Sequence, residues 1–411
     1  MQEACGSSVA TQSRLSDGIV CALLVVCSSL LYGIIAYQMG ILLTPSKANY
    51  FMRLADAFNH GSISLLSADG QTHDLIRYKE RLYLYWAPLP AVLMMPLVYF
   101  FGTGLPDALM LAILGGINVG ISFLIIRSPW RGVVLSRSTA IIIAITFGFG
   151  SVHMPLASSH GVWAVSQIVS YLFLSLSLLV VLRKDTPFAY LMAGLLGGLA
   201  CLCRLSMMGA VIGIGCLVAL GVGGRSPRHR AKKVIAFAIP LAGCALLYLA
   251  YNMARFGSPF ETGCRYHLFA PRFAADVAQY GMASAHYIWT NFWYHYLAYP
   301  FWPGVSDPTE GGSLFLMTPI YCAAFATLLP RRIDLCAAAL WLGIVLAALP
   351  ALTLFGTGWI QIGPRYTLDY TPLLLVLVSA GIATWRRPYI YAGALISVIH
   401  YMVGRTLLPP M

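Results

Sequence analysis

The sequence predicts an all-α integral membrane protein with about eleven transmembrane helices and a first external loop that contains interfacial helices. Its 411 residues are 59% hydrophobic and only 10% charged, with a mean hydropathy of +0.76. A soluble domain carries about 25% charged residues, so most of this chain is expected to lie in lipid or in a buried environment. Apolar runs long enough to cross ~30 Å of hydrocarbon recur along the chain.

Lysines and arginines gather in short loops between the apolar runs, and this bias marks the cytoplasmic side of a membrane protein. The clusters are Arg127/Arg131/Arg137, Arg183/Lys184, Arg225/Arg228/Arg230/Lys232/Lys233, Arg331/Arg332 and Arg386/Arg387. With these inside, ten of the fourteen acids fall outside: Asp56, Asp69, Asp74, Glu80, Asp107, Glu261, Asp276, Asp307, Glu310 and Asp369. A membrane protein that gathers its carboxylates on its outer face is expected to do its chemistry there.

The apolar runs indicate where the membrane spans lie. We expect them near 18–43, 107–126, 139–158, 161–182, 188–203, 206–223, 234–252, 312–330, 334–356, 366–384 and 388–405. The first run is longer than the 7–15 apolar residues of a signal peptide and no small-residue cleavage site follows it, so we expect it to be retained. The N-terminus is then cytoplasmic and the C-terminus external.

One further apolar segment, 86–101, is interpreted as an interfacial or re-entrant helix. It is short and contains three prolines, and counting it as a crossing would move every basic cluster to the outside. The interpretation leaves two large external segments, 44–106 and 253–311. Because no linker, low-complexity tract or internal repeat separates these parts, we expect residues 1–411 to form a single polytopic domain.

The first external segment contains two candidate acids. Around Asp56 the apolar residues recur at helical spacing, which predicts a short amphipathic helix at the membrane interface. Asp74 follows His73 and precedes a run of aromatic residues, Tyr78, Tyr83, Tyr85 and Trp86. The alternative is that these aromatic side chains form only an interfacial belt and that both acids are solvated.

Arginines at external span ends are candidates for binding a lipid phosphate. Arg255 and Arg265 follow the span that ends near 252, with Glu261 between them, and Arg365 precedes a later span. Paired guanidinium groups bind phosphate oxygens through charge-assisted hydrogen bonds. The alternative is that these side chains only snorkel to ordinary phospholipid head groups.

Arg204 interrupts an apolar stretch at an external turn. An arginine there is costly, so a function or a partner carboxylate is expected for it. Tyr366 and Asp369 follow Arg365 at another external span end.

Several other classes of site are not indicated. Eight of the ten cysteines lie within apolar stretches, which argues against a disulfide framework. No cluster with metal-ligand spacing is present in the sequence, so we expect neither a metal nor a cofactor. The net charge of +12 is explained by topology and anionic lipid, since no basic-aromatic nucleic-acid motif occurs.

At these motifs the chain resembles the GT-C superfamily of polytopic membrane glycosyltransferases, especially the dolichyl-phosphate-mannose mannosyltransferase-like group and its rhizobial lipopolysaccharide glycosyltransferase-like domain. The resemblance covers most of 18–385 and lies in the order of four motifs. They are Leu-Ala-Asp56-Ala-Phe-(x)2-Gly61, Asp74-Leu-(x)2-Tyr78-(x)4-Tyr83-(x)4-Pro88-(x)-Pro90, Asn252-(x)2-Arg255-Phe-Gly-Ser-Pro259 and Gly363-(x)-Arg365-Tyr366-(x)2-Asp369-(x)2-Pro372.

The resemblance implies transfer of a sugar from a polyprenyl-phosphate donor to an acceptor on the extracytoplasmic side of the inner (plasma) membrane. A carboxylate of the first external loop would be the general base, with Asp74 ranked ahead of Asp56, and the donor phosphate would be bound by Arg255, Arg265 and Arg365. The supporting residues would be His73, Tyr78, Tyr83, Arg204, Glu261, Tyr366 and Asp369.

One departure from the family pattern keeps other functions open. Common members carry an Asp shortly after the first span, where this chain has Lys47-Ala48-Asn49. The base must then come from elsewhere in the loop, or the chain is a non-catalytic accessory subunit. A transporter or flippase of lipid-linked substrate would be expected to show interrupted helices in corresponding halves, and no such repeat appears.

Overall fold

The computed structural model describes residues 2–67, 72–130, 132–221, 227–302, 304, 307–329 and 334–407, with the side chains of 2–15, 227–229 and 407 excepted. Some residues singled out in the sequence lie outside this description. They are Asp69, Arg131, Arg225, Arg331 and Arg332, together with the side chains of Cys5 and Arg228.

Helices make up most of the described chain, and the expected all-α membrane fold is confirmed. Five of these helices are long and apolar enough to cross a membrane: α1 (Gln2–Gln38), α4 (Asp107–Ile126), α7 (Val162–Arg183), α10 (Pro227–Phe256) and α14 (Leu335–Thr353). Shorter helices complete the bundle: α5 (Arg137–Phe149), α8 (Pro187–Cys203), α9 (Met208–Leu220), the 3-10 helix η5 (Pro319–Leu328), α15 (Thr371–Gly381) and α16 (Arg387–Gly404). The number of crossings, about eleven, remains a prediction.

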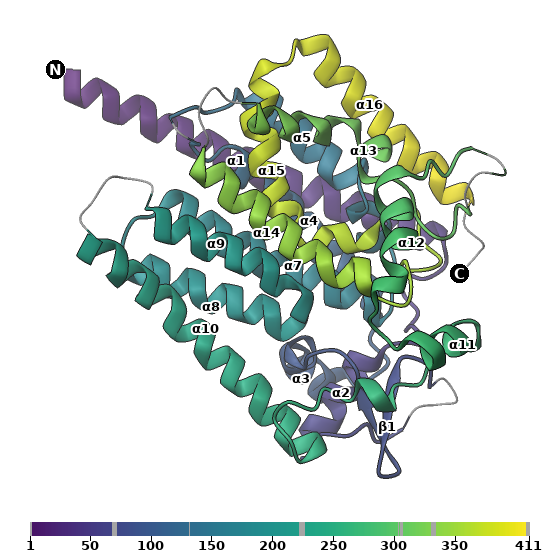
Figure 1. Cartoon of the computed structure of the whole chain (residues 1–411). Helices are drawn as coiled ribbons and strands as arrows, with labels where there is room; N and C mark the ends of the chain where they lie inside the picture. Colours follow the sequence, from purple (N-terminus) through teal and green to yellow (C-terminus); the bar gives the residue numbers. More distant parts are fainter. Residues whose placement is uncertain are drawn as a thin grey trace.

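The helices pack closely because small residues lie where they cross. α1 packs on α4, α7 packs on α4 and α8, α10 packs on α8 and α9, and α14 packs on α9 and α15 (Figure 1). A Cβ at Gly194 of α8 would overlap the carbonyl oxygen of Phe237 on α10. Such close approach of backbones is typical of membrane helices, which associate by packing rather than by the hydrophobic effect.

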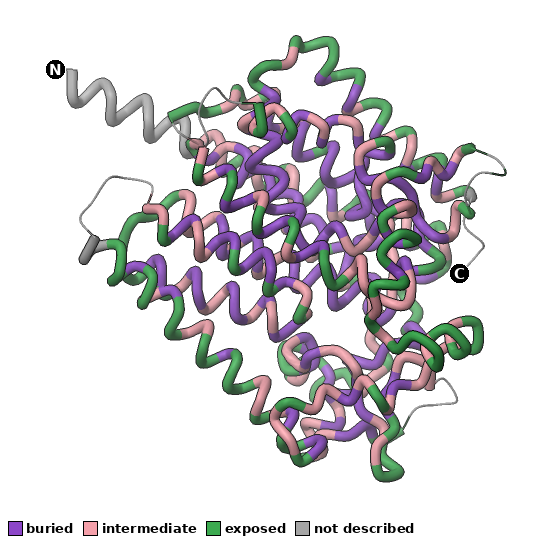
Figure 2. Tube along the Cα trace, in the orientation of Figure 1, coloured by how far each residue is buried: buried purple, intermediate pink, exposed green. Residues whose placement is uncertain are grey.

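One cluster of buried side chains, from Tyr32 to Tyr401, forms the main core. Figure 2 shows that buried residues concentrate in the middle of the bundle, whereas the outer side of α10 is largely exposed. The exposed residues on α10 are mainly apolar, among them Ile235, Ile239, Leu246 and Leu247. An apolar exposed face of this kind is expected to contact lipid.

Ion pairs between helix ends identify one end of the bundle. Arg127 and Arg137, at the end of α4 and the start of α5, contact opposite carboxylate oxygens of Asp17 in α1 at 3.0 and 2.9 Å. Lys233 of α10 contacts Asp185, which lies between α7 and α8, at 2.5 Å. Asp17 of α1 and the end of α4 therefore lie at the same end of the bundle. Helix α1 then ends, and α4 begins, at the opposite end, so the segment that connects the two helices starts and finishes there.

Contacts at the opposite end join the predicted external turns. Asp107 Oδ2, at the start of α4, accepts a hydrogen bond from the amide of Gly161, just before α7, at 2.6 Å. Arg405 donates to the hydroxyl of Ser158 at 2.9 Å. This arrangement agrees with the interpretation of 86–101 as a non-crossing segment, which the structure forms as helix α3 (Leu89–Phe101).

Several expected spans are interrupted. The span expected at 139–158 divides into α5 and α6 (His153–Ala157), and the one at 312–330 divides into α13 (Leu314–Met317) and η5. At the first break, a Cβ on Gly150 would lie 2.7 Å from the Cβ of Ser397. The remaining short 3-10 helices at or near span ends are η1 (Leu205–Met207), η6 (Arg365–Asp369), η7 (Ile382–Thr384) and η8 (Arg405–Leu407).

The two segments predicted to be external, 44–106 and 253–311, form a compact layer against one end of the bundle (Figure 1). The first contributes α2 (Tyr50–Asn59), a hairpin of β1 (Leu75–Tyr78) and β2 (Arg81–Leu84), and α3. The second contributes η2 (Cys264–Tyr266), α11 (Pro271–Tyr280), η3 (Ala285–Tyr287), α12 (Ile288–Phe292) and the π-helix η4 (Trp293–Leu297). Helix α2 was expected around Asp56, but its apolar face packs against α3 and β2 rather than remaining open to the membrane surface.

The hairpin was not predicted. Its strands pair antiparallel, with Leu75 opposite Leu84 and Tyr78 opposite Arg81. Lys79 and Glu80 form the two-residue turn with φ of 47° and 61°. Positive φ at both central residues is the mark of a type I′ turn, which normally uses Asn-Gly.

Candidate functional site

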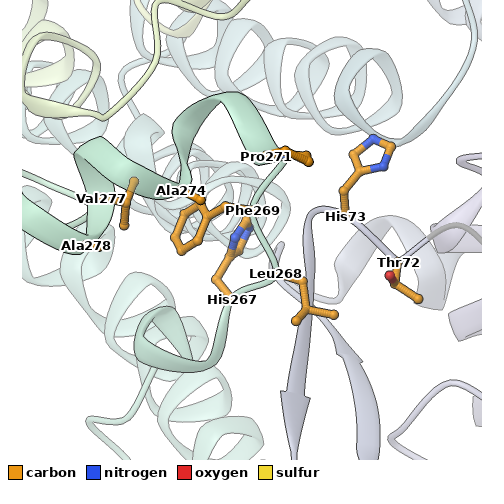
Figure 3. A pocket seen from close by; sticks show the side chains of 9 residues that line it. All are labelled: Thr72, His73, His267, Leu268, Phe269, Pro271, Ala274, Val277 and Ala278. Atoms are coloured by element: carbon orange, nitrogen blue, oxygen red, sulfur yellow. The ribbon is translucent and has the colours of Figure 1, made fainter.

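An open pocket of about 670 Å³ lies between the two external segments. Its lining comes from the residues before β1, from the stretch that joins η2 to α11, and from α11 itself. The lining residues are Thr72, His73, His267, Leu268, Phe269, Pro271, Ala274, Val277 and Ala278. Figure 3 shows His73 on one side of the pocket and Ala274, Val277 and Ala278 of α11 on the other.

Backbone hydrogen bonds join the two segments at this pocket. The amide of Leu268 donates to the carbonyl of Leu75, and the amide of Asp74 donates to the carbonyl of Leu268, both at 2.8 Å. Ile76 and His267 form an isolated β-bridge. Residues nearly two hundred positions apart are therefore held together by short-range backbone pairing.

Asp74 lies beside the pocket with its carboxylate held from two sides. The indole Nε1–H of Trp163, near the start of α7, donates to Oδ2 at 3.0 Å, and His267 Nε2 lies 3.7 Å from Oδ1. Asp74 has a φ of 65°, a left-handed conformation that Asp tolerates better than most residues. The side chain remains 23% exposed, so the carboxylate is oriented but still reachable from solvent.

His267 is a neutral neighbour of this carboxylate at physiological pH. Burial lowers the pKa of His267 to about 4, against the opposing effect of Asp74. Its ring packs on Phe269 at 4.4 Å and edge-on against Tyr85 at 4.9 Å. The imidazole therefore brings hydrogen-bonding capacity to the pocket without adding positive charge.

Arg204 has the partner carboxylate that its position in an apolar stretch predicted. Its Nε lies 3.0 Å from both carboxylate oxygens of Asp369, and the hydroxyl of Ser206 also donates to Asp369. The guanidinium lies 5.3 Å from the ring centroid of Tyr366. Asp369 therefore compensates most of the charge of Arg204.

Arg365 lies near the same tyrosine but has no carboxylate partner among the described residues. Its guanidinium is 5.4 Å from the ring centroid of Tyr366, and its Nε is buried without a hydrogen-bond partner. Arg204 and Arg365 thus both lie close to one aromatic ring, and of the two only Arg204 has a carboxylate partner among the described residues.

Tyr85 contacts the pocket residue His267. Burial raises the pKa of Tyr85 well above the usual range, with Arg204 opposing and Tyr366 adding to the rise. His267 is therefore a neighbour of both Asp74 and Tyr85.

Arg255 and Arg265, predicted to bind one phosphate together with Arg365, each have protein partners of their own. Arg255 is buried and donates to the carbonyl of Leu84 at 2.9 Å and to Asn252 Oδ1 at 2.6 Å. Arg265 is 72% exposed and pairs with Glu261 at 2.9 Å. Arg255 thus anchors the end of β2 to α10, and the three arginines lie in three different environments.

Asp56 lines a second pocket, separate from the one beside Asp74. This second pocket has a volume of about 340 Å³ and also contains Lys47 and Arg53. The carboxylate lies 3.4 Å from His60, one helical turn away on α2.

Tyr78 and Tyr83 pack the hairpin onto the end of α10. The ring of Tyr83 lies 5.5 Å from Phe256, and Tyr78 packs on both Phe256 and Tyr266, at 5.5 and 4.9 Å. Both tyrosines therefore belong to a small hydrophobic core and do not form an interfacial aromatic belt that faces lipid.

Trp163 and His267 are the site residues that the sequence interpretation missed. The hydrogen bond of Trp163 to Asp74 joins positions 89 apart, and His267 reaches the site through the β-bridge to Ile76. Neither position carries a local sequence signal for such a role. Among the described residues, no group of three His, Cys, Asp or Glu side chains is placed to hold a metal ion.

Comparisons with known proteins place this geometry in a known fold. No family model and no curated protein matches the sequence. Among solved structures, the archaeal oligosaccharyltransferase AglB from Archaeoglobus fulgidus, in complex with an inhibitory peptide and a dolichol-phosphate, has a TM-score of 0.50 at 13% identity. The match covers 93% of this chain and 55% of AglB.

The chain has the GT-C fold. ArnT from Cupriavidus metallidurans bound to undecaprenyl phosphate has a TM-score of 0.49 at 16% identity, covering 91% of this chain and 62% of ArnT. The chain thus spans little more than half the length of these structures.

The structure shows the contacts of Lys47-Ala48-Asn49, the stretch where the resemblance implied an Asp. At Lys47-Ala48-Asn49, Asn49 Oδ1 accepts a hydrogen bond from Arg53 Nε at 2.7 Å, and Asn49 Nδ2 donates to the carbonyl of Thr103 at 3.0 Å. Asn49 therefore forms a polar brace between the first turn of α2 and the connection from α3 to α4.

Proposed function

We propose that the protein is a membrane glycosyltransferase that moves a sugar from a polyprenyl-phosphate donor to a hydroxyl of an extracytoplasmic glycan, lipid or protein acceptor. The observation that carries the proposal is an oriented carboxylate, Asp74, at an open pocket in the external layer of a GT-C fold. The complex of AglB with a dolichol-phosphate supports a polyprenyl-phosphate partner. We place the protein in the inner (plasma) membrane with its active face outside.

Asp74 is the general base of this mechanism. Its carboxylate takes the proton of the acceptor hydroxyl, the hydroxyl oxygen attacks the anomeric carbon, and the bond from that carbon to the phosphate oxygen breaks. Polyprenyl phosphate leaves with the electron pair of that bond. Trp163 orients the base, which must lie within hydrogen-bond reach of the proton it removes.

Arg365 is the leading group for binding the donor phosphate, because its charge has no carboxylate partner among the described residues. A cation at this place stabilises the negative charge that develops on the departing phosphate. Tyr366 lies against the guanidinium groups of both Arg365 and Arg204 and supports the site, while Arg255 holds the hairpin in position.

A transfer assay tests this function. Purified protein in proteoliposomes is given undecaprenyl phosphate carrying a radiolabelled hexose, with envelope extract as acceptor. Asp74→Asn is nearly isosteric but cannot take the proton, so transfer should fall by ~10²–10⁴ with donor binding retained. The matched variant Asp56→Asn should transfer at nearly the parental rate, because Asp56 lines the other pocket. Parental rates in both variants would refute the mechanism.

The same assay distinguishes the enzyme from a second candidate function, that of a non-catalytic accessory subunit. The polar brace at Lys47-Ala48-Asn49 favours this second candidate. Such a subunit would bind donor without consuming it, even with acceptor present. A flippase would move donor across the bilayer with its sugar still attached.

A further inference from the structure

Helix α11 forms one wall of the Asp74 pocket although none of its own residues is buried. The side of α11 that faces the pocket carries Ala274, Val277 and Ala278. These residues give the pocket an apolar surface but do not pack α11 against the rest of the protein. A ten-residue helix without a buried face has little to hold it in place. Its position must therefore depend on specific contacts at its ends.

The first turn of α11 carries the strongest of these contacts. Arg272 donates to Glu310 Oε1 at 2.6 Å, and its guanidinium lies 4.3 Å from the ring centroid of Trp359. The adjacent Phe273 packs edge-on against Phe355 and Trp359 at 5.1 and 5.9 Å. These contacts tie α11 to the 355–359 stretch.

Glu310 is buried, with 8% of its surface exposed, and it contacts both α11 and the 355–359 stretch. We call this meeting point of α11, Glu310 and the 355–359 stretch the junction. One carboxylate oxygen meets Arg272, and the other accepts a hydrogen bond from the hydroxyl of Thr357. Its backbone carbonyl accepts from Gln361 Nε2 at 3.1 Å, and Gln361 Oε1 accepts from the amide of Arg365 at 3.2 Å. One carboxylate thus joins the pocket wall to the segment that carries Arg365.

The segment held by Glu310 is strained. Ile360 has a φ of 53°, which is a genuine outlier for a β-branched residue, and the neighbouring Gly358 has a φ of 117°. Unfavourable backbone conformations persist only where surrounding contacts hold them in place, and they are common at functional sites. Here the bridge between Glu310 and Gln361 and the bond from the Gln361 amide to Thr309 O at 3.0 Å supply that restraint.

We propose that Glu310 is a positioning residue of the transfer site, which keeps the apolar wall formed by α11 at a fixed spacing from Arg365. The role rests on the proposed function, because the spacing matters only if acceptor and donor meet between these two parts. An ordinary surface ion pair would contribute little. Glu310 differs from such a pair because it is buried, so loss of Arg272 leaves an uncompensated carboxylate in the junction.

Hydrogen–deuterium exchange on the full-length protein in detergent, without substrate, tests the junction itself. Arg272→Ala removes the contact from an exposed side chain and should not prevent folding. Exchange of 271–280 should rise roughly tenfold, the loss expected for one charge-assisted hydrogen bond. Glu310→Gln should raise exchange in both 271–280 and 357–365. Arg81→Ala, an exposed arginine of the hairpin, is the matched control and should change neither segment.

The transfer assay then tests positioning. Arg272→Ala should raise the KM for acceptor roughly tenfold with kcat within about twofold, and Arg272→Lys should recover part of the loss. Unchanged exchange in α11 would refute the junction, and raised exchange with an unchanged KM would refute its positioning role. If the parental protein transfers no sugar, the proposed function and the positioning role that rests on it both fail, while the exchange data still decide whether Glu310 holds α11.

Discussion

The pairing of Arg204 with Asp369 shows how single residues support the site. The arginine ends α8 and the carboxylate ends η6, so the pair joins two separate external turns. Their side chains are 14% and 2% exposed, which means that both charges have lost most of their water. Each charge is therefore tolerable only because the other is present.

Removing one partner should be far more damaging than removing both. Arg204→Ala leaves Asp369 buried and unpaired, and we expect a loss of ~3–5 kcal/mol of stability. The double variant Arg204→Met/Asp369→Leu replaces both charges by apolar groups and should recover much of that loss. Thermal unfolding in detergent, followed at a single scan rate, compares the variants. Equal losses for the single and the double variant would contradict the argument.

His267 should make the protein sensitive to acid. Its folded pKa of about 4 lies below the unfolded value of 6.5, so only the unfolded chain binds the proton between these values. Stability is therefore complete above pH ~6.5 and falls as the pH drops toward ~4, by up to ~3 kcal/mol. His267→Phe keeps a ring against Phe269 and Tyr85 but cannot titrate, so its unfolding temperature should fall less over this range. The exposed His60, changed to Gln, should leave the parental acid response as it is.

Individual charges in apolar stretches could be interpreted from the sequence, but their partners could not. An arginine at position 204 required a carboxylate, although nothing in the sequence indicated Asp369, 165 positions away. The role of Trp163 depends on the path of the hairpin that carries Asp74. Arg255 illustrates the opposite case, since a phosphate-binding arginine and one that anchors a strand end have the same local sequence.

At the scale of elements, the hairpin of β1 and β2 positions the site. It is also the element that the sequence did not predict. Its strands have four residues each, too few for alternation to stand out from the aromatic run. The turn is Lys79-Glu80, which lacks the Asn-Gly signal. By contrast, long apolar helices were predicted closely, as with 107–126, because their length and composition alone define them.

The strained turn predicts a stabilising change. Lys79→Asn/Glu80→Gly provides the residues that adopt positive φ most easily and should stabilise the hairpin by ~1 kcal/mol. Exchange of 75–84 should slow accordingly. Lys79→Ala/Glu80→Ala removes the same side chains but keeps the strain, so it should give no such gain. A comparable slowing in the alanine variant would mean that the side chains, rather than the backbone, are responsible.

At the scale of the whole molecule, the two ends of the bundle are distinguished by ion pairs that the sequence could indicate only by charge counting. Asp17, Arg127 and Arg137 meet at one end. Arg204 and Asp369 meet at the other, together with the external layer that contains Asp74. The basic clusters predict that the first end is cytoplasmic. The number of crossings and the single-domain organisation of 1–411 remain predictions.

Cysteine accessibility in membrane vesicles of known orientation tests the predicted sidedness. Single cysteines at 80, on the hairpin turn, and at 276, on α11, should react with an impermeant reagent added outside. Cysteines at 130 and 184, which lie in the loops after α4 and α7, should react only after the membrane is opened. These loops carry the arginines and lysines that the membrane potential and anionic lipid keep inside. Position 80 is the most informative, because α3 follows it: a crossing by α3 would place 80 and 130 on the same side. Equal labelling of 80 and 130 from outside would therefore overturn both the sidedness and the non-crossing role of α3, and would move Asp74 away from an extracytoplasmic acceptor.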